Sequence, residues 1–274
     1  MLTALLDGQR VRAAGIERSG DYRCPDADCG GRLILKRGTR RIAHFAHHPG
    51  SSCQFAGETI GHMTTKFDIA EEYRSRGYDA DVEVPVSSPV ENRRADVLIA
   101  SPRSKEVRYA IEVQDAIIGE SELWQRTRSY QAASIRPIWI SLLRHDKWQP
   151  REGEGGRILI DRYSPRLHER WIELVAGSLW LYDHQTKQFW NATFEDHLLW
   201  RGGVDYIDVG LGEHIQIDPY QVLSERWVNA VVTGPWRLNQ IRISANVKRP
   251  VGTLIGFEGV GSGQSEEGSR KGCP

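Results

Sequence analysis

The amino-acid sequence predicts an α/β (α+β) protein, and three patterns support this class. Apolar periodicity between residues 58 and 143 gives the order helix, three strands, helix, strand. Three cysteines gather before this region, among short stretches typical of β-hairpins. Two neighbouring strands of the central region each carry an acid among apolar residues. The order of helices and strands and the cysteine cluster indicate the architecture. The cysteine cluster and the two acids indicate where chemistry takes place.

The composition is that of a globular protein without a strong charge bias. The 274 residues carry a formal net charge of zero, so any nucleic-acid binding must come from local patches. No apolar run approaches the roughly 20 residues needed to span a bilayer. The first eight residues lack the pattern of a signal peptide. We therefore expect a cytoplasmic protein, with no membrane partner, whose cysteines stay reduced.

The N-terminal segment, residues 1–56, is expected to form small β-hairpins around a metal ion. Residues 2–18 contain an Asp7-Gly8 turn between apolar runs, which is a strong hairpin signal. Cys24 and Cys29 follow, then a basic hairpin, three histidines and Cys53. This layout is typical of a zinc ribbon, whose structural Zn²⁺ takes four tetrahedral nitrogen or sulfur ligands.

The expected zinc ligands are Cys24, Cys29, His47 and Cys53. His44 and His48 are alternatives to His47, and the Cys-x4-Cys spacing is looser than the usual Cys-x2-Cys. The other interpretation is three unrelated thiols.

The first helix is expected from Gly57 to Gly77, in a central region that spans residues 57–150. Glu58, His62 and Lys66 recur at four-residue intervals, so they form one polar stripe with about 6 Å between neighbours. Alone, such a stripe is more typical of a solvated helix face. It gains importance only if it faces the acids of the strands.

Asp96 and Glu112 are the acids of the two central strands, and Glu112 shares a strand face with Gln114. A buried unpaired carboxylate costs several kcal/mol, so two at similar depth predict a shared cation. Their hard oxygen atoms suit Mg²⁺ or Mn²⁺. The alternative is an edge hairpin with solvated acids.

The strand that precedes the two acid-bearing strands, residues 81–86, contains Pro85 and is expected near a sheet edge.

A second helix is expected at 117–134, a strand at 136–143 and a boundary at 144–156. Residues 157–258 form a tryptophan-rich, β-rich region that begins with a helix near 164–175. Trp171, Trp180, Trp190 and Trp200 recur about every ten residues, which favours an aromatic core over a surface that stacks bases. Residues 259–274 have the composition of a disordered tail.

Five motifs resemble the CoiA-like competence protein family, a branch of the PD-(D/E)xK nuclease superfamily with a zinc-ribbon-like N-terminal segment. The motifs are Cys24-Pro with Cys29-Gly-Gly, His44-Phe-Ala-His47, Arg94-Ala-Asp96-Val, Ala110-Ile-Glu112-Val-Gln114 and Arg136-Pro-Ile-Trp139. The resemblance covers roughly residues 15–143. It implies a restriction-endonuclease-like mixed central sheet flanked by helices.

The resemblance also implies a metal-dependent DNA nuclease active in competence or recombination. Asp96 and Glu112 match the family's metal-binding acids, Glu58 matches its helix acid, and Gln114 stands where the superfamily has lysine. Lys66 is then a relocated lysine and His62 an auxiliary base. Arg37 and Arg41 of the zinc segment and Arg126 of the second helix are the expected phosphate contacts. The alternatives are a catalytically inactive, zinc-stabilised DNA-binding or recombination-accessory protein, or a protein-interaction module built on the tryptophan-rich region.

Overall fold

The computed structural model describes residues 1–16, 19–39, 41–53, 55–104, 106–244 and 256–259. The helices are α1 (Ile60–Ser75), α2 (Glu120–Ala132) and α3 (Leu167–Ala176), with 3-10 turns at His145–Lys147, Glu154–Gly156 and Leu238–Gln240. The N-terminal strands are β1 (Thr3–Leu6), β2 (Gln9–Arg12), β3 (Leu33–Lys36) and β4 (His44–His47). The central strands are β5 (Asp79–Val86), β6 (Arg93–Ala100), β7 (Arg108–Gln114) and β8 (Ile135–Leu142). The remaining strands are β9 (Arg151–Glu152), β10 (Ile158–Tyr163), β11 (Leu179–Asp183), β12 (Gln188–Arg201), β13 (Val204–Asp208), β14 (Glu213–Ile217), β15 (Tyr220–Arg237), β16 (Ile241–Ser244) and β17 (Gly256–Gly259).

A mixed sheet of nine strands forms the body, in the order β5-β6-β7-β8-β11-β12-β15-β10-β9. The pairs β7–β8 and β8–β11 are parallel, and the other neighbours are antiparallel. β5, which contains Pro85, is the edge strand expected from the sequence. The predicted class, a mixed sheet flanked by helices, is confirmed.

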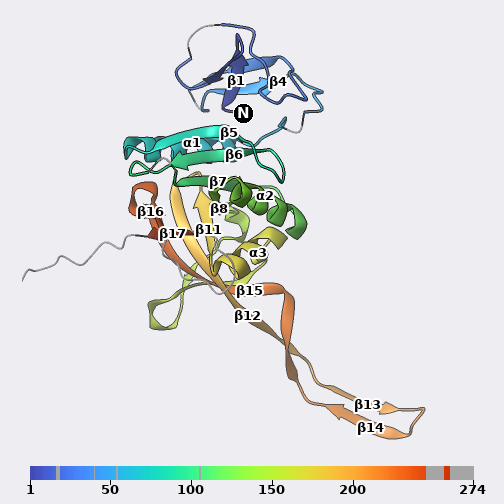
Figure 1. Ribbon diagram of the computed structural model, residues 1–274. Helices are drawn as coiled ribbons and strands as arrows, with labels where there is room; N and C mark the ends of the chain where they lie inside the picture. Colours follow the sequence, from blue (N-terminus) through green and yellow to red (C-terminus); the bar gives the residue numbers. More distant parts are fainter. Residues whose placement is uncertain (17–18, 40, 54, 105, 245–255, 260–274) are drawn as a thin grey trace, which may run out of the picture.

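Helices cover both faces of the sheet because the central strands are apolar on both sides. Alternate side chains divide between the two faces: Ile138 and Tyr182 pack with α1, whereas Trp139 and Leu181 pack with α2 and α3. Figure 1 shows α1 beside β5 and β6, and α2 and α3 together beyond β7 and β8. None of the helices that the structure describes is long and apolar enough to cross a membrane.

The sheet continues through the boundary expected at 144–156. β11, β12, β15 and β10 extend the sheet that begins with β5, instead of forming a separate meander. Trp180 is buried on the α1 side, and Trp171 and Trp190 pack on the other side, as the aromatic-core interpretation expected. Trp200 differs, because 69% of it is exposed.

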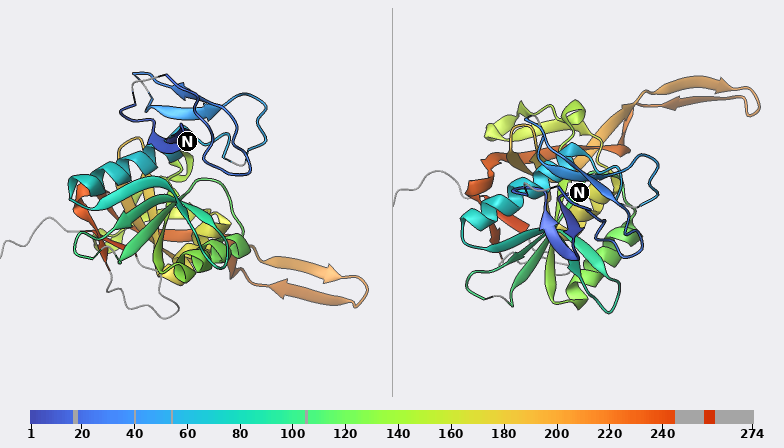
Figure 2. Two further views of the ribbon diagram at one scale, coloured as in Figure 1. Left: turned by 45° about the horizontal axis from the view of Figure 1, so that its top comes forward. Right: turned by 90° about the horizontal axis from the view of Figure 1, so that it is seen from above.

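Two strands of this sheet run far beyond the body. β12 has 14 residues and β15 has 18, and they pair as far as Arg201↔Tyr220. The β13–β14 hairpin continues beyond their ends, and Figures 1 and 2 show the resulting ribbon projecting into solvent. The expected tail at 259–274 lies outside the described residues, except for Gly259, which ends β17.

The N-terminal segment forms two small hairpins, β1–β2 and β3–β4, around a core of its own. Asp7 and Gly8 have positive φ angles of 51° and 77°, as a two-residue hairpin turn requires. The segment sits over α1 and β5 (Figure 1). Glu83 connects the two parts, because its carboxylate accepts hydrogen bonds from the backbone N–H groups of Leu2 (2.8 Å) and Thr3 (3.0 Å).

Candidate active site and metal centre

The candidate active site opens where β6 and β7 separate. Their pairing ends at Val97↔Ile111. Beyond it, Asp96 Oδ2 accepts a hydrogen bond from the N–H of Val113 (3.0 Å), and Glu112 Oε1 accepts from the N–H of Asp96 (3.4 Å). Each carboxylate thus replaces a backbone hydrogen bond of the β6–β7 ladder, and these two contacts hold the carboxylates side by side.

A cavity of about 450 Å³ lies at this separation. Six of the residues selected from the sequence line it: Glu58, His62, Asp96, Glu112, Gln114 and Arg126. Arg93, Arg94 and Tyr130 also line it, whereas Lys66, Arg37 and Arg41 are not among its lining residues. Six of the 18 lining residues were therefore selected from the sequence, and Arg37 and Arg41 of the N-terminal segment lie elsewhere.

His62 bridges two of the acids. Its Nδ1 is 2.7 Å from Glu58 Oε1, and its Nε2 is 3.1 Å from Asp96 Oδ2. Burial alone would lower the pKa of His62, but the charges and hydrogen bonds of Asp96 and Glu58 raise it to about 10. The imidazole is therefore cationic in this state. Glu58 lies just before the helix and not within it, because Thr59 is the N-cap of α1.

Lys66 lies beneath the acids, with its side chain fully buried. Its Nζ forms ion pairs with Glu58, with Glu83 (2.8 Å) and with Asp96 (3.7 Å). Burial disfavours its charge, but the three carboxylates raise its pKa above the usual value. The stripe from Glu58 to Lys66 therefore faces the acids, which the sequence left open.

Sequence reasoning missed Glu83. Alternation along β5 places this residue with the exposed side chains, and the pairs Val82↔Val97 and Val84↔Ala95 leave it opposite Asp96 in an unshifted register. Its positive φ of 53° departs from extended backbone, and its carboxylate is turned inward, since only 1% of the residue is exposed. Burial would raise the pKa of Glu83, but Lys66 lowers it to about 2.

Asp96 and Glu112 differ in charge state although they are neighbours. Burial would raise the pKa of Asp96, but the cations of His62 and Lys66 lower it to about 2. Burial, reinforced by the negative charge of Asp96, raises the pKa of Glu112 to about 7. Tyr130 donates a 2.6 Å hydrogen bond to Glu112, and Arg126 lies 3.7 Å from it. The pair thus combines a permanent carboxylate with one that can exchange a proton near neutral pH.

Gln114 and two arginines complete the wall. The Gln114 amide donates to the Ala116 carbonyl (2.5 Å), so the position expected for lysine carries no charge. The Arg94 guanidinium lies over the Phe55 ring, 3.4 Å from its centroid, and one of its terminal nitrogens is buried without a hydrogen-bond partner. Arg93 lies beside it on the cavity wall. The Arg93-Arg94 pair, directly before Asp96 on one strand, was the available sequence signal for a basic rim.

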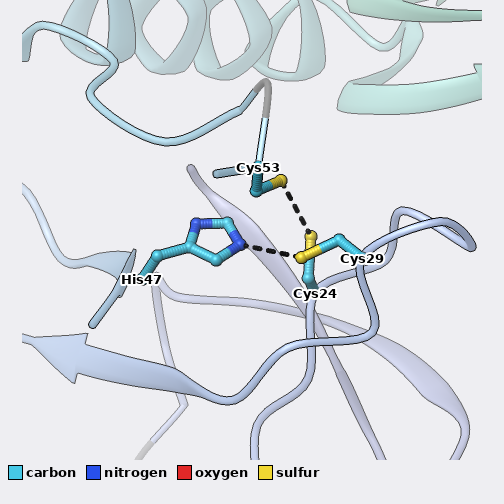
Figure 3. Close-up of side chains that lie close together, drawn as sticks. All are labelled: Cys24, Cys29, His47 and Cys53. Carbon is cyan, nitrogen blue, oxygen red and sulfur yellow. Dashed lines mark hydrogen bonds between the residues drawn. The ribbon is translucent and has the colours of Figure 1, made fainter. Parts of the chain in front are cut away.

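A second cluster lies in the N-terminal segment. One ligand atom from each of Cys24, Cys29, His47 and Cys53 lies within 4.8 Å of the others (Figure 3). Cys29 Sγ is 3.5 Å from His47 Nε2, and Cys24 Sγ is 3.9 Å from Cys53 Sγ. These three thiols and one imidazole form a group that could hold a metal ion.

The other two histidines of this segment lie outside the cluster. His44 Nδ1 lies 2.9 Å from the Ile42 carbonyl, and His48 is exposed. The structure thus brings His47, and neither of its two alternatives, to the thiols.

Comparison with known proteins matches the two parts of the chain, the N-terminal segment and the body, to separate family models. Residues 58–194 match the family model described as the nuclease-like domain of competence protein CoiA, and residues 6–56 match the model of its N-terminal domain. The chain belongs to the CoiA-like competence protein family. Its nuclease-like domain contains the cavity, and its N-terminal domain contains the cysteine–histidine cluster.

One curated relative is the competence protein CoiA of Bacillus subtilis (strain 168), which is 30% identical over 114 residues. The match covers 41% of this chain and 29% of the relative, so it spans less than a third of that protein. Among solved structures, a protein of unknown function, AF1548, matches with a TM-score of 0.24 and 15% identity. That match covers 29% of this chain and 46% of the other.

Proposed function

We propose that this chain is a metal-dependent nuclease that hydrolyses phosphodiester bonds in DNA, in processing linked to competence or recombination. One observation carries the proposal: Glu58, Asp96 and Glu112 line one cavity together with Arg93, Arg94 and Arg126. Acids beside arginines are the combination needed to hold a cation and a phosphate at the same place.

The residues present fit a divalent cation. Glu58, His62 and Asp96 offer ligand atoms within 4.8 Å of one another, and Glu112 stands next to Asp96. The oxygen donors of Asp96, Glu112 and Glu58 would hold Mg²⁺ or Mn²⁺. Such an ion would supply Lewis-acid stabilisation of charge on the phosphoryl group. The cationic His62 bridges Glu58 and Asp96 in this state, so it must shift when an ion binds between them.

The chain's own groups supply the remaining chemistry. Arg94 has a buried nitrogen without a hydrogen-bond partner, and this nitrogen is suited to a phosphate oxygen. Glu112 has a pKa of about 7 in the metal-free protein, so it would release a proton when it takes its place as an ion ligand. The deeply buried Lys66 holds Glu58 and Asp96 in position and does not line the cavity.

Supercoiled plasmid and labelled single-stranded, double-stranded and branched oligonucleotides test this function. We expect cleavage with Mg²⁺ or Mn²⁺ and none with a chelator. The product ends then identify an endonuclease or an exonuclease. DNA that stays intact with every metal, at protein concentrations that bind it, would exclude the proposed hydrolysis.

A second candidate function is DNA binding without cleavage. The observation that favours it is Gln114, whose amide is engaged by the Ala116 carbonyl and carries no charge. No lysine stands among the described residues that line the cavity. Binding that is unchanged in Asp96→Ala, with no cleavage under any metal, supports this alternative.

Glu112→Gln is expected to remove a pH dependence of stability in the metal-free protein. The pKa of Glu112 in the fold, about 7, exceeds its ordinary value of 4.5, so ionisation opposes folding. The protein gains the full benefit of the neutral form below pH 4.5, and this benefit is lost as the pH rises to about 7. The loss is about 3 kcal/mol. Urea unfolding at several pH values measures it, and an unchanged slope in Glu112→Gln contradicts the assignment.

We propose that the cysteine–histidine cluster binds structural Zn²⁺. Cys53→Ser is expected to remove the metal and to destabilise the N-terminal domain, since structural zinc contributes on the order of 10 kcal/mol to such small segments. Elemental analysis and thermal unfolding provide the measurement. Cys273→Ser, outside the described residues, is the matched control and should keep one zinc per chain. Full zinc content in Cys53→Ser would refute the ligand set.

A further inference from the structure

A second hollow lies beside the cavity of the candidate active site, and the chemistry proposed above does not use it. We call it the groove. It measures about 420 Å³, and the described residues that line it are Val90, Ser121, Trp124, Gln125 and Arg128. Its volume falls within the roughly 300–1,000 Å³ typical of sites for small ligands. The groove is therefore large enough to hold one unit of a longer substrate.

The groove and the cavity share both of their walls. The segment between β5 and β6 contributes Val90 to the groove and Glu91 to the cavity. Helix α2 contributes Trp124 to the groove and Arg126 to the cavity. A hydrogen bond from Gln125 Nε2 to Glu91 Oε2 (2.6 Å) joins the two walls. A strand with a phosphate in the cavity would therefore bring a neighbouring nucleotide to the groove.

Trp124 gives the groove an aromatic surface held in a fixed place. The residue is half-buried, because part of it packs against the buried residues on the α2 and α3 side of the sheet. The rest of it lines the groove. Val90, which is 52% exposed, adds an apolar side chain from the other wall. An aromatic ring of this kind can stack on a nucleobase of any identity.

The charge of the groove favours a phosphate. Arg128 is exposed and forms no ion pair with any described residue, and none of the described residues that line the groove is acidic. Of the acids nearby in the sequence, Glu91 and Glu122 are each paired with an arginine, at 2.5 and 2.7 Å. Glu120 lies in the first turn of α2, about 12 Å along the helix axis from Arg128. Arg128 can therefore contact a phosphate that adjoins a base on Trp124.

We propose that the groove holds an unpaired nucleotide of the strand whose phosphate enters the cavity, so that the substrate is single-stranded DNA or a single-stranded stretch of a longer molecule. This inference rests on the proposed nuclease function. Trp124 stacks on the base, and Arg128 contacts the adjoining phosphate. In a duplex each base is paired and stacked between its neighbours, so its face is not free to meet Trp124.

Binding of a short, fluorescently labelled oligothymidine to the full chain tests the proposal. Anisotropy is measured with Ca²⁺ in place of Mg²⁺, and a gel confirms that the probe stays intact. We expect the single strand to bind at least tenfold more tightly than the same strand annealed to its complement. Trp124→Leu keeps an apolar side chain against the core and should weaken single-strand binding roughly tenfold. Trp200→Leu, at a tryptophan that is 69% exposed and lines neither hollow, is the matched control and should change nothing.

A probe with abasic positions separates stacking from a structural role of Trp124. It keeps the phosphates and lacks the bases, so the original chain should bind it roughly tenfold more weakly. Trp124→Leu should cause no further loss on this probe. An equal loss on both probes, or a duplex bound as tightly as the single strand, overturns the proposal.

Arg128→Gln tests the phosphate contact. It should weaken binding of the intact and the abasic probes alike, and it should reduce the slope of log K against log salt concentration by about 0.7, the value for one phosphate of a single strand. An unchanged slope overturns this contact.

These measurements do not depend on cleavage. If binding depends on Trp124 as expected but no metal supports cleavage, the proposed hydrolysis fails and the groove still binds an unpaired nucleotide. If DNA is cleaved but the duplex binds as tightly as the single strand, the hydrolysis stands and the inferred substrate class is wrong.

Discussion

Asp96→Asn is expected to abolish metal-dependent DNA cleavage, with a loss on the order of 10³-fold or more. Asparagine keeps the size of the side chain and an oxygen that can accept from the Val113 N–H, so the separation of β6 and β7 should persist. It removes the one carboxylate that contacts His62 and Lys66 and also stands next to Glu112. The variant therefore loses a charged metal ligand and keeps the shape of the site.

A control variant and a binding measurement separate this effect from misfolding. Asp183→Asn replaces another buried aspartate, which accepts hydrogen bonds from the turn at Gln185 and Thr186 and does not line the cavity. It should retain cleavage while losing some stability. Mn²⁺ binding, followed by calorimetry or electron paramagnetic resonance, should weaken in Asp96→Asn only. Cleavage within tenfold of the original rate in Asp96→Asn would show that the site assignment is wrong.

The sequence predicted the two central acids because strand periodicity is local. Asp96 and Glu112 interrupt apolar alternation within single strands, and a few residues on either side are enough to place them. The stripe of Glu58, His62 and Lys66 was also visible, as four-residue spacing. The sequence did not show which way the stripe faces, because a solvated helix face and a buried one have the same spacing. Only the packing of α1 on the sheet decides between them.

Glu83 and the projecting ribbon of residues 198–223 could not be predicted for a related reason. Alternation assigns Glu83 to the exposed side of β5, and a local departure from extended backbone, with φ 53°, reverses this. The ribbon depends on pairing between β12 and β15, in which Leu198 meets Leu223 across the whole β13–β14 hairpin. Strand register over such a distance is set by tertiary contacts, and short apolar runs in the sequence do not contain it. The α-amino group of Met1, 3.1 Å from Glu58, has no signature in side-chain patterns at all.

Lys66→Met is expected to destabilise the fold by about 3–5 kcal/mol, which is the usual cost of leaving buried charges without their partner. The lysine is the shared cation of Glu58, Glu83 and Asp96, and methionine fills its volume without compensating them. Urea unfolding at pH 7 gives the size of the loss. Removing one of the stranded charges in Lys66→Met with Glu83→Gln should recover part of it, since the two sites are in direct contact.

The pH dependence distinguishes this charge effect from a simple loss of packing. In the original chain the pKa values of Glu83 and Asp96 are lowered to about 2. The stabilisation they provide is therefore present above their ordinary values near 4 and is lost as the pH falls toward 2. Without Lys66, burial raises the pKa of these carboxylates, so they take up protons more readily. The difference in the free energy of unfolding between Lys66→Met and the original protein should therefore become smaller as the pH falls from 7 to 5. A gap that stays constant over this range would mean that Lys66 acts through packing, and that the acids of the cavity are held in place by other groups.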